Sequence, residues 1–139
     1  MKNEVQVTFP ALVENASLAR LIVMGVLAPL DADTQQLTEI KTVVSEAVTN
    51  AIIHGYEGNP SGLIELHIEL DLRHLFVQVK DNGVGIDDVE QAKQPLFTTK
   101  VEEERSGLGF MIMESFTDEF KVESAPGVGT TVTFEREIV

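Results

Sequence analysis

One helical stretch constrains this chain more than any other feature, because it is apolar on nearly every side and still carries an acid and an amide. Apolar residues recur at helical spacing through residues 37–53 and occupy most faces of the predicted helix. Glu46 and Asn50 lie four residues apart, so they stack one turn above the other, and His54 extends the same row. Burying a carboxylate without a partner is costly, so this row is expected to face a cavity, a metal or a ligand. The alternative is a solvated polar face.

The composition is that of one globular domain, with 139 residues of which 43% are hydrophobic and 24% charged. A formal net charge of -13 disfavours direct binding to nucleic acid or to an anionic membrane, because both require phosphate-neutralising cations. There is no cysteine and no signal-peptide pattern, and the longest apolar run, at 21–30, is too short to span a bilayer. We therefore expect a cytoplasmic protein whose partners are proteins or small molecules.

The remaining periodicities predict an α/β (α+β) two-layer sandwich with a mixed, largely antiparallel sheet and helices on one face. Strict alternation or apolar runs predict strands at 4–9, 64–72, 75–80, 119–124 and 130–138. Helical spacing and capping signals predict helices at 14–27, 33–54 and 108–116.

Several local features refine these elements. Asp33 followed by Gln36 resembles a capping box at the start of the long helix. In the helix at 14–27 the expected core positions are Leu18, Leu21, Ile22 and Val26, with Arg20 on the exposed side. His67 is expected on the solvent-facing side of a strand and His74 in a turn. Neither histidine is expected to have other potential metal ligands beside it. Residues 93–106 lack a sustained period, which is typical of a lid over a site.

Three glycine-containing segments carry the chemistry. Asp81-Asn82-Gly83-Val84-Gly85-Ile86 follows a strand directly, so the Asp81 carboxylate can accept a hydrogen bond from an exocyclic amine while the glycines let backbone approach a ligand. Ser106-Gly107-Leu108-Gly109 opens a helix, where free N–H groups bind phosphate. The third is Gly127-Val128-Gly129-Thr130. Each segment alone is also explained as an ordinary turn or loop.

Together, and in this order after Glu46 and Asn50, the segments resemble the GHKL (Bergerat) ATP-binding superfamily of gyrase, mismatch-repair and sensor-histidine-kinase ATPases. The resemblance covers nearly the whole chain as one domain, 1–139, with an ATP lid at about 93–106. Residues 37–56 and 94–100 are most similar to the bacterial anti-sigma-factor serine kinases, and among these to the sporulation members.

The resemblance implies roles for the matching residues. Asn50 would hold Mg²⁺ bridging the ATP phosphates, Glu46 would be the general base, and Asp81 would bind the adenine amine. The other nucleotide-binding positions that the resemblance implies are His54, Gly83, Gly85, Ile86, Ser106, Gly107, Leu108, Gly109 and Thr130. Contacts to phosphate or to a partner are implied for Lys100, Arg105 and Arg20, each of which is alternatively a solvated cation.

The resemblance also implies two linked activities, which are sequestering a sigma factor and phosphorylating a serine of an anti-anti-sigma factor. A homodimer is expected on the same ground. The chemistry agrees, because phosphoryl transfer mainly requires a metal clamp, phosphate donors and a residue that orients the nucleophile. The alternatives are a nucleotide-gated sigma-binding protein that transfers no phosphate, a general-stress anti-sigma kinase, and the catalytic domain of a sensor histidine kinase. The presence of Glu46 favours a kinase.

Overall fold

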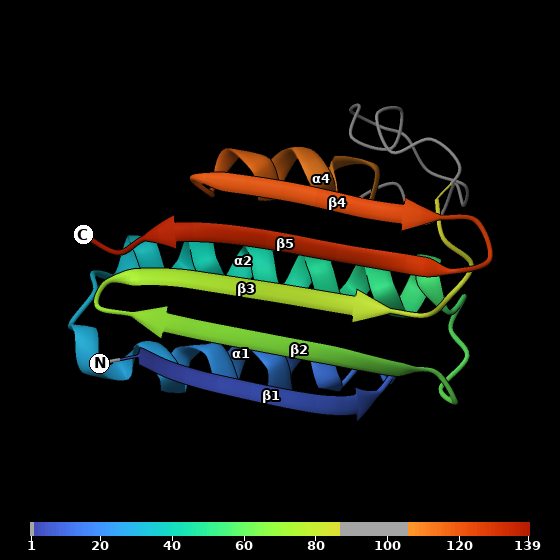
Figure 1. Ribbon diagram of the computed structural model, residues 1–139, viewed down its shortest axis with the longest axis horizontal. Helices are drawn as coiled ribbons and strands as arrows, with labels where there is room; N and C mark the ends of the chain where they lie inside the picture. The colour runs from blue at the N-terminus through green and yellow to red at the C-terminus, as the bar shows by residue number, and fades with distance from the viewer. Residues whose placement is uncertain (1, 87–105) are drawn as a thin grey trace.

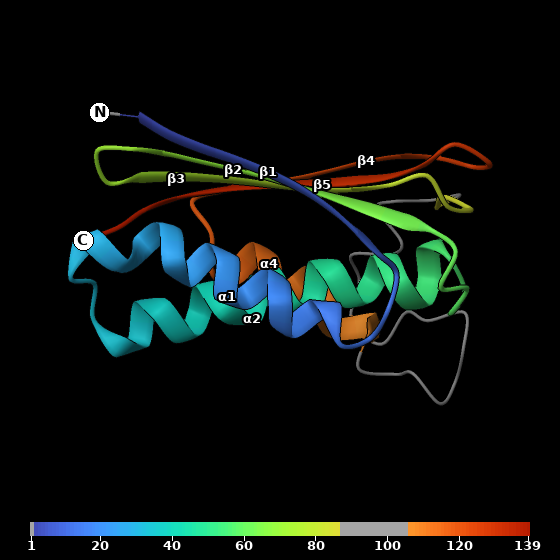
Figure 2. The same ribbon diagram turned by 90° about the horizontal axis from the view of Figure 1, so that it is seen from below.

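The protein is built in two layers, a sheet and a layer of helices, in a computed structural model that describes residues 2–86 and 106–139. The strands are β1 (Lys2–Pro10), β2 (Leu63–Asp71), β3 (His74–Asp81), β4 (Glu119–Ala125) and β5 (Gly129–Glu137). The helices are α1 (Asn15–Leu27), α2 (Thr34–Asn50) and α4 (Ser106–Ser115), with a short 3-10 turn at Ala28–Leu30 and a π-helix at Ala51–Gly55. Figure 1 shows the strands in front of the helices, and Figure 2 shows that the helices all lie on one face of the sheet. The two-layer α/β sandwich is confirmed.

The sheet has five strands in the order β1-β2-β3-β5-β4. Each neighbouring pair is antiparallel, so the expected mixed sheet is antiparallel throughout the described residues. This order places β3 and β5 at the centre, where the last residue of β3, Asp81, pairs with Thr130 near the start of β5. Two chain segments distant in sequence therefore meet at one end of the sheet.

The core lies between the sheet and α2. Alternate residues of β2 and β3 are buried, as period-two patterns predict, and α2 buries residues on several faces. The buried hydrophobic residues of these three elements are Ile64, Leu66, Ile68, Leu70, Leu75, Val77, Val79, Ile40, Val43, Val44, Ala47 and Val48. Six of the 17 residues of α2 are buried, and its apolar residues are all among them except the half-buried Leu37, so the expected burial holds for the apolar positions and not for most of the helix. Among the described residues, no helix is long and apolar enough to cross a membrane.

The core stripe of α1 matches the predicted one only in part, because Val26 is buried and Ile22 packs partly buried against the core, whereas the two predicted leucines are exposed. Leu18 is 39% exposed and Leu21 is 70% exposed, whereas the buried residues of this helix are Ala16, Ala19, Val23, Val26 and Leu27. Two apolar stripes coexist on α1, and the one with small alanines faces inward because alanine lets the helix approach its neighbours closely. Leu18 and Leu21 are left on the surface, whereas Leu27 at the end of the helix is buried.

His74 is also placed differently from the prediction. It is the first residue of β3 and pairs with Asp71, so the turn consists of Leu72 and Arg73. Leu72 adopts a positive φ of 56°, which is uncommon for a residue with a branched side chain. The predicted lid at 93–106, with Lys100 and Arg105, lies outside the described residues apart from Ser106 in α4.

Asp33 and Gln36 form one of the two hydrogen bonds of the predicted capping box, the one in which the Asp33 side chain caps the helix. Asp33 is the N-cap of α2, and its Oδ1 accepts a hydrogen bond from the Gln36 backbone N at 2.8 Å. The Gln36 side chain, which is buried, instead reaches the backbone beyond β5. Its Nε2 donates to Val139 O at 2.7 Å, and Val139 N donates to its Oε1 at 2.8 Å. The first turn of α2 is thereby tied to the strand layer.

We predict that Gln36→Ala lowers the free energy of unfolding by about 1 to 2 kcal/mol, because it removes two part-buried hydrogen bonds and leaves the Val139 N–H and C=O without these partners. Chemical denaturation followed by circular dichroism measures the change. Gln35→Ala is the matched control, since the exposed Gln35 side chain makes only a 3.4 Å contact with Glu39. An equal effect of the two substitutions would contradict the role of Gln36.

Candidate functional site

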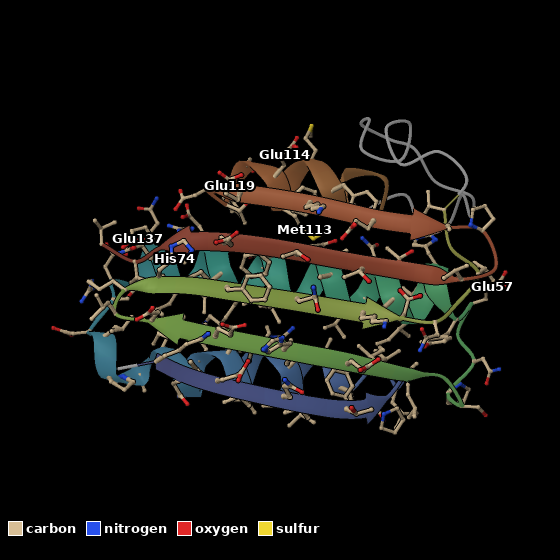
Figure 3. All side chains as sticks on the ribbon, viewed as in Figure 1. Glu57, His74, Met113, Glu114, Glu119 and Glu137 are labelled. Carbon is tan, nitrogen blue, oxygen red and sulfur yellow. The ribbon has the colours of Figure 1, made fainter. Side chains whose placement is uncertain are left out.

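The predicted site residues gather at one end of the sheet, where β3 ends and β5 begins. Figure 3 shows Glu57, just beyond the π-helix, near this end, and His74 with Glu137 at the opposite end. The described residues form two adjoining groups here. One is centred on Asp81 and Thr130, and the other is centred on Glu46 and Asn50.

Asp81 is a buried acid at the end of a central strand. The residue is 5% exposed, and its Oδ1 accepts a hydrogen bond from Gly83 N at 2.9 Å. Burial raises the pKa of the Asp81 carboxyl above its usual value, and hydrogen bonds from the backbone of Gly83 and Thr130 only partly oppose this. A carboxylate whose burial is not fully compensated by the protein is suited to accept a hydrogen bond from a ligand.

Gly55, at the end of the π-helix, makes room for the Asp81 carboxyl. A Cβ at position 55 would lie 2.8 Å from Asp81 Cγ, so any larger residue would press on the acid. The helix predicted at 33–54 ends just before Gly55, and the close approach of Gly55 to Asp81 was not predicted. The signal was present, because a glycine between an apolar helix and a loop permits close approach of another segment as well as helix termination.

The other glycines of this group also serve backbone packing. A Cβ on Gly83 would lie 1.9 Å from Gly55 O, and one on Gly129 would lie 2.2 Å from Asp81 O. Gly85, at φ 79°, would bring its Cβ to 2.1 Å from Ala125 O. The glycines were expected to let backbone approach a ligand. In the structure they let the helix end, the Asp-Asn-Gly segment and the β4–β5 turn approach one another.

Two further side chains hold these segments, and sequence reasoning missed both. Tyr56 Oη accepts from Asn82 N at 2.7 Å and donates to Leu63 O, so it links the loop after the π-helix to the segment after β3. Ser124, on β4, has Oγ contacts to Ile86, Gly129 and Thr130. Each residue also has one partner far away in sequence, since Asn82 is 26 positions from Tyr56 and Ile86 is 38 positions from Ser124, so no short local motif indicates these links.

The second group joins α2 to the first turn of α4. A Cβ on Gly109 would lie 2.9 Å from Glu46 Oε2 and 3.4 Å from Asn50 Nδ2, so both side chains face this turn. Ser106, Gly107 and Leu108 precede Gly109 in the same turn of the helix. The first four N–H groups of a helix have no partner within it and carry the positive end of the helix dipole. An acid and an amide therefore converge on an anion-attracting helix end.

His54 lies in the π-helix that follows α2, and its place in the row of Glu46 and Asn50 stays a prediction. The α-helical pattern ends at Asn50, and Tyr56 N bonds to Ala51 O, five residues back, as in a π-helix. Short π-helical segments are rare and occur frequently at functional sites.

Arg20 lies on α1 and is not simply a solvated cation. Its Nη1 donates to Ser45 Oγ at 2.7 Å and its Nη2 to Ser17 Oγ at 2.8 Å. It borders a pocket of about 260 Å³ between α1 and the end of α2, whose lining residues are Val13, Ala16, Ser17, Arg20, Thr49, Ile52 and Ile53. This pocket is separate from the two groups described above.

The exposed face of the sheet carries charge pairs that the sequence analysis did not expect. His67 Nε2 lies 2.7 Å from Glu4 Oε2 and 3.2 Å from Glu69 Oε2, because β1 and β2 place these side chains as neighbours on one face. Lys2 Nζ lies 2.6 Å from the other oxygen of Glu69 and lowers the pKa of that carboxyl. The cluster is satisfied as a network of ion pairs.

His74 also lies beside two acidic side chains. Its Nε2 lies 2.6 Å from Glu135 Oε1 and its Nδ1 lies 2.9 Å from Glu137 Oε1, and these carboxylates raise the pKa of the imidazole. Figure 3 shows the His74–Glu137 pair beside the C-terminal end of β5. Neither histidine was expected to have other potential metal ligands beside it, and this is wrong, because carboxylates lie next to both.

We predict that Asp81→Asn raises the free energy of unfolding at pH 7, because it removes a buried charge and keeps an oxygen for the Gly83 N–H. The folded-state pKa of Asp81 is raised, so the stability cost of its charge is present at neutral pH. The gain should shrink as the pH falls through that raised pKa and vanish below the unfolded value of roughly 4. Denaturant titrations at several pH values measure it.

The matched control is Asp71→Asn, at an exposed aspartate, for which a change within about 0.5 kcal/mol is expected. A less stable Asp81→Asn variant at pH 7 would contradict the assignment, since it would mean that interactions of the charged carboxylate outweigh its burial.

Comparison with known proteins identifies the family. Residues 9–136 match the family described as histidine kinase-like ATPase domain. The chain is 52% identical to the anti-sigma F factor of Halalkalibacterium halodurans and 51% identical to that of Bacillus subtilis, in each case over 99% of this chain and 94% of the relative. It is 54% identical to the anti-sigma F factor of Geobacillus stearothermophilus, over 98% of this chain and 93% of the relative.

Solved structures share the fold. The crystal structure of the RsbU and RsbW domains of Rv1364c from Mycobacterium tuberculosis matches 98% of this chain and 32% of that chain, with a TM-score of 0.66 and 20% identity. The catalytic domain of histidine kinase ThkA matches 98% of this chain and 96% of that chain, with a TM-score of 0.60 and 22% identity. At these identities the likeness shows the fold alone. With its family match and its relatives over nearly the whole length, the chain belongs to the histidine kinase-like ATPase domain family of the GHKL superfamily, in the branch of the anti-sigma F factors.

Proposed function

We propose that the protein is an anti-sigma factor that binds Mg-ATP, sequesters a sigma factor and phosphorylates a serine of an anti-anti-sigma factor. The observation that carries the catalytic part is the convergence of Glu46 and Asn50 on Gly109, in the first turn of α4. A phosphate-binding helix end, a metal-binding amide and a carboxylate base are the parts that phosphoryl transfer requires. The sigma-factor part rests on the names of the relatives.

Asp81 and Thr130 form the proposed base pocket. Both side chains are buried and lie opposite each other on β3 and β5, so a purine inserted at this end of the sheet would meet two oxygen-bearing side chains. An exocyclic amine would donate a hydrogen bond to the Asp81 carboxylate. This bond would help to offset the cost of burying the charged carboxylate, which the backbone hydrogen bonds from Gly83 and Thr130 offset only in part. Gly83, Gly85 and Ile86 would border the base and the ribose.

Asn50 would hold Mg²⁺ through its amide oxygen. The residue fits this role because Mg²⁺ prefers oxygen ligands and is usually bound by few protein side chains together with phosphate oxygens. The half-buried Asn50 also lies beside the first turn of α4, where Ser106, Gly107 and Leu108 would contribute backbone N–H groups to the phosphates. Bound Mg²⁺ would neutralise charge on the transferring phosphoryl group. His54, Lys100 and Arg105 remain proposed contacts of the nucleotide or of a partner.

Glu46 would act as the general base that takes the proton from the incoming serine hydroxyl. It is one helical turn from Asn50, which places the base next to the proposed metal ligand. The alternative is a nucleotide-gated sigma-binding protein without phosphoryl transfer, and the position of Glu46 beside Gly109 favours the kinase. A general-stress anti-sigma kinase would have the same chemistry with a different partner.

The proposed partner surface includes α1. Leu21 and Val13 are about 70% exposed, and Arg20 lies beside them next to the pocket between α1 and α2. Exposed apolar side chains around an arginine are typical of protein-binding surfaces. The strongly negative charge of the chain supports protein partners over nucleic acid or a membrane surface. A cytoplasmic homodimer is part of the same proposal.

We predict that Glu46→Gln leaves Mg-ATP binding near normal and slows phosphoryl transfer by about 10² to 10⁴-fold, because glutamine keeps the side-chain volume but cannot take a proton. Transfer of labelled phosphate from ATP to a serine-bearing anti-anti-sigma protein measures the rate. Glu65→Gln, on the exposed face of β2, is the control. A Glu46→Gln variant that works at the parent rate would contradict the general-base role.

We also predict that Asn50→Ala and Asp81→Ala each abolish measurable Mg-ATP binding, the first by removing the metal ligand and the second by removing the acceptor for the adenine amine. Calorimetric titration with Mg-ATP tests both variants, and Asn3→Ala on β1 is an exposed control. Undiminished affinity in Asp81→Ala would remove the assignment of the base pocket.

A further inference from the structure

Ser124 makes three polar contacts at the base pocket with a single hydroxyl. Its Oγ lies 2.7 Å from Ile86 N, 2.9 Å from Gly129 O and 2.8 Å from Thr130 Oγ1. It thereby connects the segment after β3 with the start of β5. No role follows for Ser124 from the family motifs in the sequence.

The positions of the hydroxyl protons follow from the chemistry of the three partners. A serine hydroxyl has one proton to donate and two lone pairs to accept with. The backbone N–H of Ile86 can only donate, and the carbonyl of Gly129 can only accept. All three contacts are hydrogen bonds at once only if Ser124 donates to Gly129 and accepts from Thr130. The hydroxyl proton of Thr130 is then used in the hydrogen bond to Ser124.

Thr130 consequently offers only lone pairs to anything else that it meets. It is 9% exposed and pairs with Asp81, which is 5% exposed, across β3 and β5. An ionised carboxylate is also acceptor-only. The two side chains of the pocket therefore both accept hydrogen bonds, and neither can donate one while the Ser124 network is intact.

We propose that Ser124 is a positioning residue that makes the pocket selective for 6-amino over 6-oxo purine nucleotides, by holding the Thr130 hydroxyl as a hydrogen-bond acceptor. This inference rests on the proposed function, in which the purine lies at Asp81 and Thr130. A 6-amino purine offers N–H donors to the two acceptors. A 6-oxo purine places carbonyl lone pairs there and has only its N1–H to donate, so at least one of the two buried acceptors faces a lone pair and stays unpaired, which is a source of discrimination.

The test compares Mg-ATP with Mg-ITP, because inosine and adenosine nucleotides differ only at the base edge, with a 6-oxo and N1–H replacing the 6-amino group and N1. Calorimetry gives both dissociation constants for the parent, and we expect a clear preference for ATP. In Ser124→Ala the Thr130 hydroxyl can rotate and donate to the 6-oxo group. The ATP-over-ITP preference should fall about five- to tenfold, the worth of one hydrogen bond.

Two further variants separate positioning from simple damage. Ser124→Thr keeps the hydroxyl and should keep the preference, while Ser115→Ala removes a hydroxyl that donates to Ile112 O within its own helix and should change nothing. A loss of ATP and ITP affinity by the same factor in Ser124→Ala would overturn the inference, because it would indicate a purely structural serine.

A double-mutant cycle with Thr130→Val tests whether Ser124 acts through Thr130. Valine has a similar shape and no hydroxyl, so Thr130→Val should also reduce the preference, and adding Ser124→Ala should change it by less than about twofold. An undiminished preference in Thr130→Val would overturn the inference even if Ser124→Ala does not fold. Absence of ATP binding by the parent would instead overturn the proposed function and this inference with it.

Discussion

The carboxyl of Asp81 is buried against the backbone of Gly55, and the candidate site depends on this contact between the end of a helix and the end of a central strand. Gly55 O also accepts a hydrogen bond from Val84 N at 2.8 Å. The missing Cβ atoms of Gly55, Gly83 and Gly129 let three distant segments pack backbone to backbone. An acid held in this way is costly to ionise, and it is poised to gain from a ligand that donates hydrogen bonds to it.

The helix α2 serves the core and the site at once. Residues such as Ile40 and Val44 are completely buried beneath the sheet, and they fix the helix on which Glu46 and Asn50 stand. Rigid support of this kind matters because catalytic side chains must be held close to their productive geometry. The change from α-helix to π-helix after Asn50 then turns the chain so that Gly55 reaches Asp81. Packing and chemistry are thus coupled through one element.

The layers of the fold could be predicted from the sequence, because they depend on local patterns. The residues of the candidate site were also proposed from local patterns and a family resemblance, and the structure brings several of them together at one end of the sheet. Period-two alternation in β2 and β3 and the apolar faces of α2 are strong signals, and the glycine segments follow one another at recognisable positions. The inward face of α1 was not predictable in this way. Leucines outweigh alanines in a hydrophobicity pattern, whereas close packing of α1 selects Ala16 and Ala19.

Other features arise from contacts between residues far apart in the chain. The bonds from Gln36 to Val139 span 103 positions, and Ser124 reaches back 38 positions to Ile86. His74 acquires its carboxylate partners from β5, which begins long after the turn in which the histidine was expected. No short sequence window contains such information, so these residues were misplaced or overlooked. The nucleotide-contacting roles themselves came from resemblance to a family.

The central claim is that Mg-ATP binds where α2, β3 and β5 converge, and backbone amide chemical shifts test it most directly. In a titration of the isotope-labelled protein with Mg-ATP, the account predicts the largest shifts at Gly55, Gly83, Gly109 and Thr130. The amides of His74 and Glu135, at the other end of the sheet, should remain nearly unchanged. Shifts concentrated around His74, or no saturable shifts at millimolar Mg-ATP, would contradict the account.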